Sequence, residues 1–550
     1  MVEVLFINGN VWTMDERNSQ AGCVAVENGV ITGVWQGAIP PEEDVVITDE
    51  MTVVDLKGDT LLPGFIDTHN HILMYGLLKK HVNCSTPLNE SIDDVLQLLA
   101  NKASETKNGE WIQGYGFDDT LIAEGKHLTR KDLDQACPSN PVIVRHISGH
   151  LASVNTLALE YAGLDDFATE PDAGHFGRDE RGRLNGVLYE PGAMNPIVEK
   201  IPAPTVEEMV DALQDAANDY VAQGITTNSD AAVSGLDELK AHVQAAKRRV
   251  NPMRSRLMMM HYLLGEGAHF GLYTPEQLNE ELMLRSDGLV QLDSVKMFQD
   301  GSIQGLTGAL RKPYHKYPDV LGDFIHEQGP FQEEVLDLHK RGFRITIHGN
   351  GDRAIGSILD AYYYAIDKYP RTDHRHRIEH VQSATTEDIE KMRQLGVAGS
   401  FFINHVYYWG DRHERIFLGP ERAQRISPLA EAVNNQLLFT LHSDCPVTPI
   451  SPLFSVWAAV NRTTREGRTL GPEQRIDVIT ALKAMTIYGA VLNFEEDHSG
   501  SIEIGKKADF VVLAEDPVAV QPETIKDITV KATFINGEMV YENINTDTER

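Results

Sequence analysis

The stretch LLPGFIDTHNHI ends an apolar run with a Pro-Gly turn and places Asp67, His69 and His71 on alternate residues. In an extended strand, residues two apart share one face, so these side chains point the same way. Two neutral imidazoles there can bind a divalent metal ion such as zinc. Because the chain has 21 His, an H-x-H pair is also expected by chance. A second pair, His374 and His376 in RTDHRHR, sits among charges, where we expect a solvated turn.

Four further polar residues interrupt or end apolar runs: Lys296 in LDSVKMFQDGS, His348 in RITIHGNGD, His380 in RIEHVQ and Asp444 in LHSDCPV. His348 could instead be a hydrogen-bonded core histidine. Asp444 could cap the helix expected near Ser451, although it lies seven residues too early for that role. Lys296 is the hardest to explain by packing, because a lysine inside an apolar strand is costly unless its charge is paired or neutralised. The matching positions of all four favour one shared site.

Strand-like and helical patterns alternate along most of the chain, which is typical of an α/β fold. Nine runs look like strands, one more than a (β/α)8 barrel needs. Helical patterns follow most of them, as in SATTEDIEKMRQLGV, where Thr385 or Thr386 could cap the helix and Gly396 could end it. Polar, turn-rich sequence surrounds PVIVRHI, so we place that run in an insertion at about residues 85–200, after the first barrel strand. The remaining eight runs predict a TIM-type barrel, which carries its reactive side chains at the carboxyl ends of the strands.

Both ends of the chain contain short strand-like runs broken by Asn-Gly and similar turns, as in FINGN near the start and FINGE near the end. Neither end has enough strands to bury a face by itself. We therefore expect residues 1–58 and 491–550 to pair into one small β-sandwich, and residues 59–490 to form the barrel with its insertion.

Composition excludes several classes of protein. The formal net charge of -32 over 550 residues should repel nucleic acid and anionic lipid. The four cysteines form no C-x-x-C pair, which fits a reducing compartment. We find no signal-peptide pattern and no apolar run of membrane-spanning length. We therefore expect a cytoplasmic protein with a small-molecule substrate and no nucleic-acid or membrane partner, for which a homodimer is one assembly that the sequence allows.

The order H-x-H, Lys, His, His, Asp resembles that of the binuclear members of the amidohydrolase superfamily. Within it, the YtcJ-like branch is the most similar, through the motifs PGFIDTHNHI, WIQGYGFDD, GHLASVNTLAL, GITT, KMFQDGS, IHGNGDRAI, RIEHVQ, HSDCPV and GSIEIGKKADFVVL. The resemblance covers nearly the whole chain. One departure is His442, where the branch leads us to expect Gly before the Ser-Asp pair.

The resemblance implies a binuclear metal centre. Two divalent ions are expected, with zinc as the first choice and manganese, iron or cobalt able to substitute. Lys296, carboxylated by carbon dioxide, would become an anion that bridges both ions. The resemblance assigns His69, His71 and Asp444 as ligands of one ion. It assigns His348 and His380 as ligands of the other ion.

The resemblance also implies a mechanism. A water bridging the two ions would be hydroxide at neutral pH, because bound cations lower the pKa of water towards about 7. This hydroxide would attack a carbonyl polarised by one metal, while Asp444 accepts its proton and passes it to the leaving nitrogen. The expected activity is metal-dependent hydrolysis of a C–N (amide) bond, other than a peptide bond, in a small molecule, with N-substituted amides among the expected substrates.

Candidate substrate contacts follow the seventh barrel strand, in SFFINHVYYWGDRH. Aromatic walls with a single polar group suit a ligand with an apolar portion, so we expect His405, Tyr408 and Trp409 to contact the substrate. The same rings could instead pack a loop against the barrel. His150, which belongs to the insertion, is expected to reach over the mouth of the barrel as part of a lid.

Two alternatives to the amide hydrolase remain open. A deaminase or other mononuclear member of the superfamily would lack the strand-four lysine, so Lys296 argues against it. A non-catalytic regulatory relative would be free to lose ligands, whereas all six are present here.

Overall fold

The computed structural model describes residues 2–86, 88–119, 121–147, 151–171 and 174–544. The chain forms two compact units, one of residues 1–73 with 213–550 and one of residues 74–212. Each unit is described by itself below.

Eight parallel strands in the first unit form a nearly closed barrel. In spatial order they are β8 (Phe65–Asn70), β15 (Ile225–Val233), β16 (Arg254–Met260), β17 (Val290–Phe298), β18 (Ile345–Gly349), β19 (Arg377–His380), β20 (Ala398–Phe401) and β21 (Phe439–Leu441). The two end strands meet just beyond their carboxyl ends, where the Asp444 N–H donates to the His69 carbonyl at 3.1 Å. The eight apolar runs are therefore barrel strands in chain order, and the predicted TIM-type barrel is confirmed.

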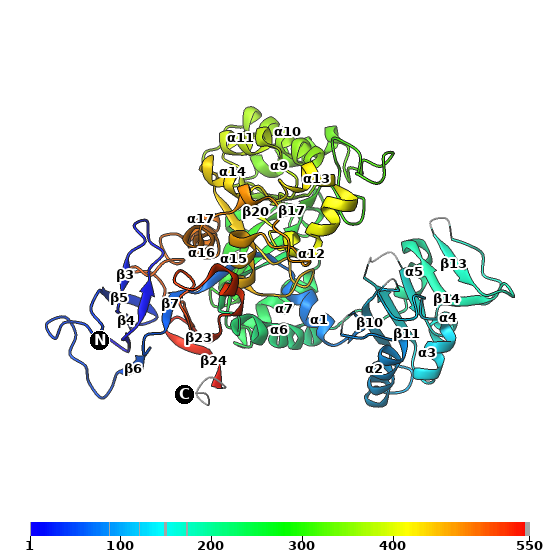
Figure 1. Ribbon diagram of the computed structural model, residues 1–550, viewed down its shortest axis with the longest axis horizontal. Helices are drawn as coiled ribbons and strands as arrows, with labels where there is room; N and C mark the ends of the chain where they lie inside the picture. The colour runs from blue at the N-terminus through cyan, green and yellow to red at the C-terminus, as the bar shows by residue number, and fades with distance from the viewer. Residues whose placement is uncertain (1, 87, 120, 148–150, 172–173, 545–550) are drawn as a thin grey trace. The chain divides into compact units, whose positions relative to one another are not determined.

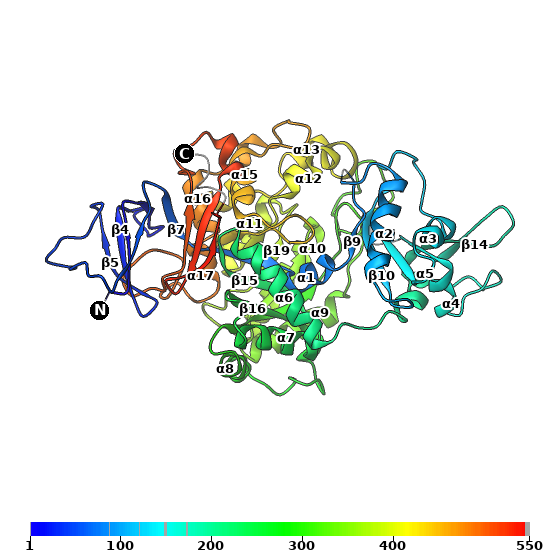
Figure 2. The ribbon, with the colours of Figure 1, turned by 90° about the horizontal axis from the view of Figure 1, so that it is seen from below.

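Helices follow the strands, and Figure 2 shows α6 and α7 beside β15 and β16. From residue 206 onward the helices, in chain order, are α6 (Val206–Val221), α7 (Leu236–Lys247), α8 (Pro275–Arg285), α9 (Gln328–Lys340), α10 (Asp352–Lys368), α11 (Thr386–Leu395), α12 (His405–Arg412), α13 (Gly419–Ala423), α14 (Leu429–Asn434), α15 (Pro452–Asn461), α16 (Val478–Ala484) and α17 (Ile487–Leu492). Thr385 caps α11 in a reciprocal pair with Asp388, and Gly396 ends it at φ +68°. The predicted start and stop of that helix are confirmed.

Segments from both ends of the chain form two further sheets. One has the order β5 (Val30–Trp35), β4 (Cys23–Glu27), β1 (Val4–Ile7), β6 (Thr52–Asp55). The other has the order β24 (Glu538–Glu542), β23 (Val530–Ile535), β22 (Phe510–Leu513), β7 (Thr60–Pro63), β2 (Asn10–Trp12), β3 (Gln20–Ala21), and Figure 1 shows its red strands next to the blue β7. Phe6 packs edge-to-face on Phe510 and Phe534, at centroid distances of 5.2 and 5.0 Å. The two ends thus share a hydrophobic core, while the β-sandwich and its boundaries stay predictions.

The second unit has its own sheet, in the order β13 (His175–Arg178), β14 (Leu184–Tyr189), β12 (Leu151–Val154), β11 (Val142–His146), β10 (Ile112–Phe117), β9 (Val82–Asn83). Its helices are α2 (Ile92–Glu105), α3 (Arg130–Ala136), α4 (Thr156–Tyr161) and α5 (Glu190–Val198), and α1 (Ile72–Lys79) leads into it from the barrel. The run PVIVRHI supplies β11 and is no barrel strand, as expected. The proposed limits of about 85–200 stay a prediction.

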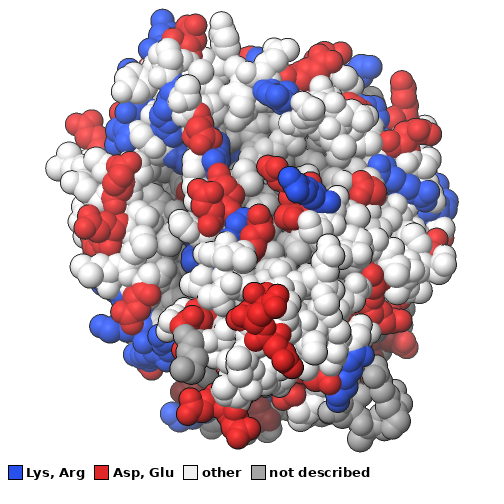
Figure 3. All heavy atoms as spheres, turned by 90° about the vertical axis from the view of Figure 1, so that its left-hand side faces the viewer, with Lys and Arg blue, Asp and Glu red and all other residues white. Residues whose placement is uncertain are grey.

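Charged side chains of both signs are interspersed on the face of the molecule in Figure 3, where acidic groups occur over most of the view. Among the helices of the described residues, none is long and apolar enough to cross a membrane.

The prediction of a solvated turn at His374 and His376 is wrong. Both side chains are buried, at 5% and 0% exposure, and the His376 ring stacks on Tyr362 at 5.0 Å. Backbone groups satisfy the His374 ring: the backbone N–H of His376 donates to His374 Nδ1 at 3.0 Å, and His374 Nε2 lies 3.0 Å from the Leu395 carbonyl oxygen. Neutral histidines can be buried among charged neighbours in the sequence when such partners exist.

Candidate metal centre

The six predicted ligands lie at or just beyond the carboxyl ends of five barrel strands. His69 and His71 belong to the end of β8 and the residue after it, Lys296 lies in β17, His348 in β18, His380 in β19, and Asp444 follows β21. In a parallel barrel these ends surround one mouth, which is where such folds carry their reactive groups.

His69, His71 and Asp444 form a compact group. Oδ1 of Asp444 lies 3.5 Å from His69 Nε2 and 3.3 Å from His71 Nε2. The three potential ligand atoms all lie within 4.8 Å of one another. Asp67, although it alternates with them, is engaged elsewhere, because its Oδ2 accepts a 2.6 Å hydrogen bond from Ser443.

His348 and His380 form the adjacent pair, with ring centroids 4.4 Å apart, and His380 lies 4.8 Å from the His69 ring. Nε2 of His348 lies 3.1 Å from the Gly301 carbonyl oxygen and 2.9 Å from the amide nitrogen of Asn350. The group of two and the group of three are therefore neighbours at one mouth.

Two of these residues hold a backbone conformation that is rare for residues other than glycine. His380 has φ +70° and Asp444 has φ +53°. Left-handed backbone at such residues costs about 1–3 kcal/mol and persists where the surrounding structure enforces it, which is common at functional sites. The surrounding structure therefore holds these two side chains at the mouth in spite of this energetic cost.

Lys296 is fully buried, and its Nζ has no hydrogen-bond partner among the described residues. The amine lies 4.8 Å from the centroid of the Phe298 ring. Burial lowers the pKa of Lys296 to about 8, although Glu379 and Asp444 act in the opposite direction. A buried, unpartnered amine is costly, so this lysine calls for a chemical explanation.

The protonation states fit a divalent cation. Burial, followed by the charge of Lys296, lowers the pKa of His348 to about 4. Burial also holds the pKa of His69 and of His380 well below 6.5. Neutral imidazoles offer lone pairs. Oδ1 of Asp444, which lies between His69 and His71, accepts no hydrogen bond from any described residue. The donor types and their spacing therefore suit zinc or a related ion. A charged ammonium at Lys296 would not suit such an ion.

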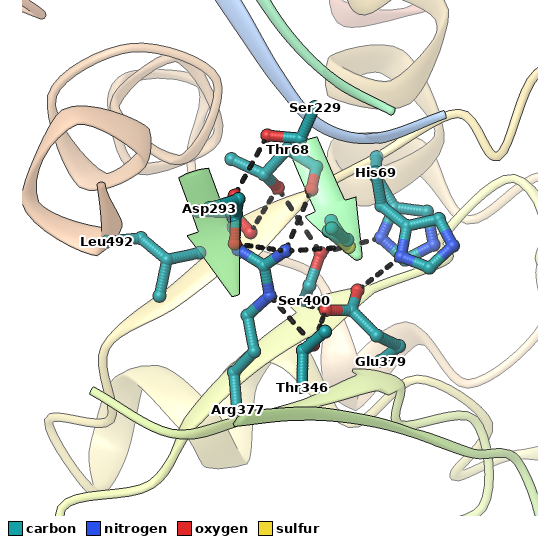
Figure 4. A network of polar contacts seen from close by, with 12 residues as sticks. Thr68, His69, Ser229, Asp293, Thr346, Arg377, Glu379, Ser400 and Leu492 are labelled. Carbon is teal, nitrogen blue, oxygen red and sulfur yellow. Dashed lines mark hydrogen bonds and ion pairs between the residues drawn. The ribbon is translucent and has the colours of Figure 1, made fainter. Parts of the chain in front are cut away.

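A buried ionic network that the sequence interpretation missed supports His69 (Figure 4). Nδ1 of His69 lies 2.5 Å from Oε2 of Glu379. Arg377 and Thr346 donate to the other oxygen of Glu379, and Arg377 also pairs with Asp293 at 3.4 Å. Burial is the largest single influence on Glu379 and opposes its ionisation, but Arg377, Lys296 and the other neighbours together outweigh it and lower the pKa of this carboxyl to about 2. The signal in the sequence was a glutamate inside the apolar run RIEHV, directly before His380.

Comparison with known proteins agrees with this geometry. The sequence pattern of the amidohydrolase family matches residues 52–541. The chain belongs to the amidohydrolase family. It is 27% identical to the YtcJ protein of Bacillus subtilis (strain 168), named as an amidohydrolase, over 98% of this chain and 100% of that one. It is 29% identical to an N-substituted formamide deformylase of Arthrobacter pascens, over 98% of this chain and 99% of that one.

A solved structure of an uncharacterized metal-dependent hydrolase from Pyrococcus horikoshii OT3 is similar to this amidohydrolase, with a TM-score of 0.77. The likeness covers 94% of this chain and 99% of that one at 23% sequence identity, which shows the shared fold.

In this amidohydrolase, an aromatic row leads away from the metal-centre residues. Phe402 lies 5.9 Å from the His380 ring and 4.5 Å from His405, whose ring lies 4.4 Å from Trp409. His405 is buried and its Nδ1 lies 3.1 Å from Nε2 of His413. The structure thus brings His405 and Trp409 together on α12, near one end of the predicted site.

Tyr408 and His150 differ from that pair. The Tyr408 ring contacts Trp409 at 5.7 Å but also Phe454 at 5.7 Å and Tyr407 at 5.1 Å, so much of it packs within the helix layer. His150 lies outside the described residues.

The second unit of this amidohydrolase carries a separate group of titratable side chains at the carboxyl ends of β10 and β11. Oδ1 of Asp119 lies 3.1 Å from Nε2 of His146 and 3.4 Å from Nδ1 of His127. Asp118 lies 4.0 Å from the same His146 nitrogen. These pairs were not among the predicted site residues.

Proposed function

We propose that this amidohydrolase cleaves the C–N bond of a small N-substituted amide at a binuclear metal centre. Family membership supports metal-dependent hydrolysis of C–N bonds in general. The observation that carries the finer proposal is the position of Asp444 Oδ1, 3.5 Å from His69 Nε2 and 3.3 Å from His71 Nε2, next to a second histidine pair and a buried lysine.

In this proposal His69, His71 and Asp444 hold one ion, and His348 and His380 hold the other. Zinc is the expected metal, with manganese, iron or cobalt able to substitute. Two bound ions would supply an acidified water and polarise the amide carbonyl.

Lys296 would bridge the two ions as a carbamate. Its lowered pKa, about 8, leaves a larger neutral fraction near pH 7 than an exposed lysine has. The ammonium first loses one proton; the neutral amine then forms an N–C bond to carbon dioxide and loses a second proton, so that the former cation becomes an anion with two oxygens. This change of sign removes the conflict between a buried ammonium and two divalent ions.

Asp444 would move the proton. Its carboxylate would accept a proton from the attacking water and deliver it to the leaving nitrogen, so that one amide and one water give a carboxylic acid and an amine. The pair His69 and His71 flanks the carboxylate and limits its orientation.

The aromatic row from Phe402 to Trp409 suits an apolar substituent on the amide. One relative is named for deformylation of N-substituted formamides, so formamides with apolar N-substituents come first among candidate substrates. We propose His405, Tyr408 and Trp409 as substrate contacts and His150 as part of a lid.

The test is a release assay on the metal-loaded protein with formamides, N-acyl amines, N-acyl amino acids and cyclic amides. The expected result is stoichiometric acid and amine from at least one class. Two bound ions without release from any class would contradict the proposal. Ammonia from an amino-heterocycle would favour a deaminase, and absence of tightly bound metal would favour a regulatory relative. A cytoplasmic location and a homodimer stay predictions.

A further inference from the structure

His442, the departure noted in the sequence, fills the barrel interior between the two groups of predicted ligands. It is fully buried. Its ring stacks on His69, with centroids 4.7 Å apart and an angle of 25°, and on Phe402 at 5.4 Å and 22°. Its Nε2 lies 3.1 Å from Nδ1 of His380, and its Nδ1 lies 2.8 Å from Oγ of Ser400. Both nitrogens are therefore engaged.

The Ser400 hydroxyl belongs to a buried chain of hydroxyls. It lies 3.3 Å from Oγ1 of Thr68, which lies 2.8 Å from Oγ1 of Thr440. Hydroxyls both donate and accept, so Ser400 can take the Nδ1 hydrogen of His442. The bare Nε2 of His442 then accepts the Nδ1 hydrogen of His380.

The opposite arrangement has a different consequence for the metal centre. If Nε2 of His442 carried the hydrogen and donated to His380 Nδ1, the hydrogen of a neutral His380 would sit on Nε2. That nitrogen could then bind no cation. A cation at Nε2 of His380 is compatible only with His442 acting as an acceptor.

We propose that His442 is a positioning residue. By accepting the Nδ1 hydrogen of His380, it makes Nε2 of His380 the metal-binding nitrogen, and by stacking on His69 it holds the two groups of ligands side by side. This inference rests on the proposed binuclear centre. Partners of this kind at a ligating histidine typically change metal affinity by about 10- to 100-fold.

The test compares two variants of the full chain after metal removal. His442→Gln offers an amide oxygen to His380, and His442→Leu offers no acceptor. Stepwise dissociation constants for Zn²⁺ are measured by competition with a chromophoric chelator, and folding by circular dichroism. We expect His442→Leu to lower the affinity for one of the two ions by about 10- to 100-fold and the affinity for the other by much less. His442→Gln should restore the weakened constant to within a few-fold of the wild type.

Two further variants keep the test decisive. His376→Leu removes another fully buried histidine, near the start of β19, and should leave both constants unchanged. Ser400→Ala keeps the His442 imidazole but removes the acceptor of its Nδ1 hydrogen. It should weaken the binding of one of the two ions, and it tests the inference even if His442→Leu does not fold.

Unchanged constants in His442→Leu or in Ser400→Ala would overturn the inference. Equal losses in His442→Gln and His442→Leu would also overturn it, because His442 would then act as a ligand itself. In each case amide cleavage by a wild type with two bound ions would leave the proposed function standing.

Discussion

Nδ1 of His69 lies 2.5 Å from Oε2 of Glu379, and both side chains are buried inside the barrel. Glu379 is held in turn by Arg377, so the carboxylate cannot turn away from the imidazole. With Nδ1–H donated to Glu379, the lone pair of His69 is on Nε2, 3.5 Å from Asp444. A carboxylate in this position fixes the orientation of a ligating histidine and raises its basicity.

We therefore expect Glu379→Gln to lower metal affinity by about 10- to 100-fold while the chain remains folded. Equilibrium dialysis against zinc, with circular dichroism as the folding check, measures this. Glu390→Gln, which alters an exposed residue of α11, is the matched control and should bind as the wild type does. Equal affinities of the two variants would show that Glu379 does not support the site.

Lys296→Ala should lose metal and activity together. A structural lysine would cost stability without specific loss of metal, whereas a carbamate that touches both ions contributes to holding them. Metal content after gel filtration and turnover of a cleaved amide are measured on the same sample, with the exposed Lys340→Ala as the control. Acetate or propionate should restore part of both, because a small carboxylate can fill the vacated bridge. An alanine variant that keeps both ions and full turnover would rule out the assignment.

Asp444→Asn should keep the fold and lower turnover by about 10²- to 10⁴-fold, since proton transfer typically contributes that much. The assay is run at saturating metal, so that weaker binding is separated from slower chemistry. Turnover close to that of the wild type would remove Asp444 from the proton transfer.

The barrel and the position of the six predicted ligands at its strand ends were accessible from the sequence, because each of these residues interrupts or ends an apolar run. Such polar residues are conspicuous at the strand ends, and a parallel barrel gathers strand ends at one mouth. The support of His69 by Glu379 was not accessible in this way. Their separation in the chain is 310 residues, and only the folded barrel brings β8 and β19 together across its interior.

The buried histidines His374 and His376 show the converse limit. Charged neighbours in RTDHRHR suggested exposure, but local charge says nothing about partners from distant elements. His339, on α9, lies 2.8 Å from His376, and the Leu395 carbonyl lies 3.0 Å from His374. Hydrogen bonds of this kind make burial of neutral imidazoles tolerable.

Trp409→Ala should alter the ranking of amide substrates, with the largest rise in KM for those with apolar N-substituents. Trp409 lies 4.4 Å from His405 at the far end of the aromatic row, so its loss removes apolar contact area and not the metal ligands. Tyr408→Ala is measured beside it on the same panel. If both variants rank the amides as the wild type does, these rings are packing and not substrate contacts.

The last prediction concerns acid stability and rests on three buried imidazoles whose hydrogen bonds fix them as neutral. The Ile345 N–H donates to His376 Nδ1 at 3.0 Å, so Nε2 of His376 carries the hydrogen and donates to His339 Nδ1 at 2.8 Å. His339 Nε2 then donates to the Tyr369 carbonyl at 2.8 Å. Nδ1 of His374 accepts a hydrogen bond from the backbone N–H of His376 at 3.0 Å. A proton added to any of these acceptor nitrogens would face another hydrogen.

Burial lowers the pKa of His374 from 6.5 to about 4. Between these values the unfolded chain binds more protons than the folded one, so the free energy of unfolding falls as the pH falls from about 6.5 to about 4. At 1.36 kcal/mol for each pKa unit, His374 alone would contribute a loss of about 3 kcal/mol at most. Urea unfolding of the metal-free protein at several pH values in this window tests it. His374→Gln, which cannot titrate, should lose less stability on acidification than the wild type, while the exposed His498→Gln should follow the wild-type curve. Parallel curves for all three proteins would exclude His374 as a source of acid sensitivity.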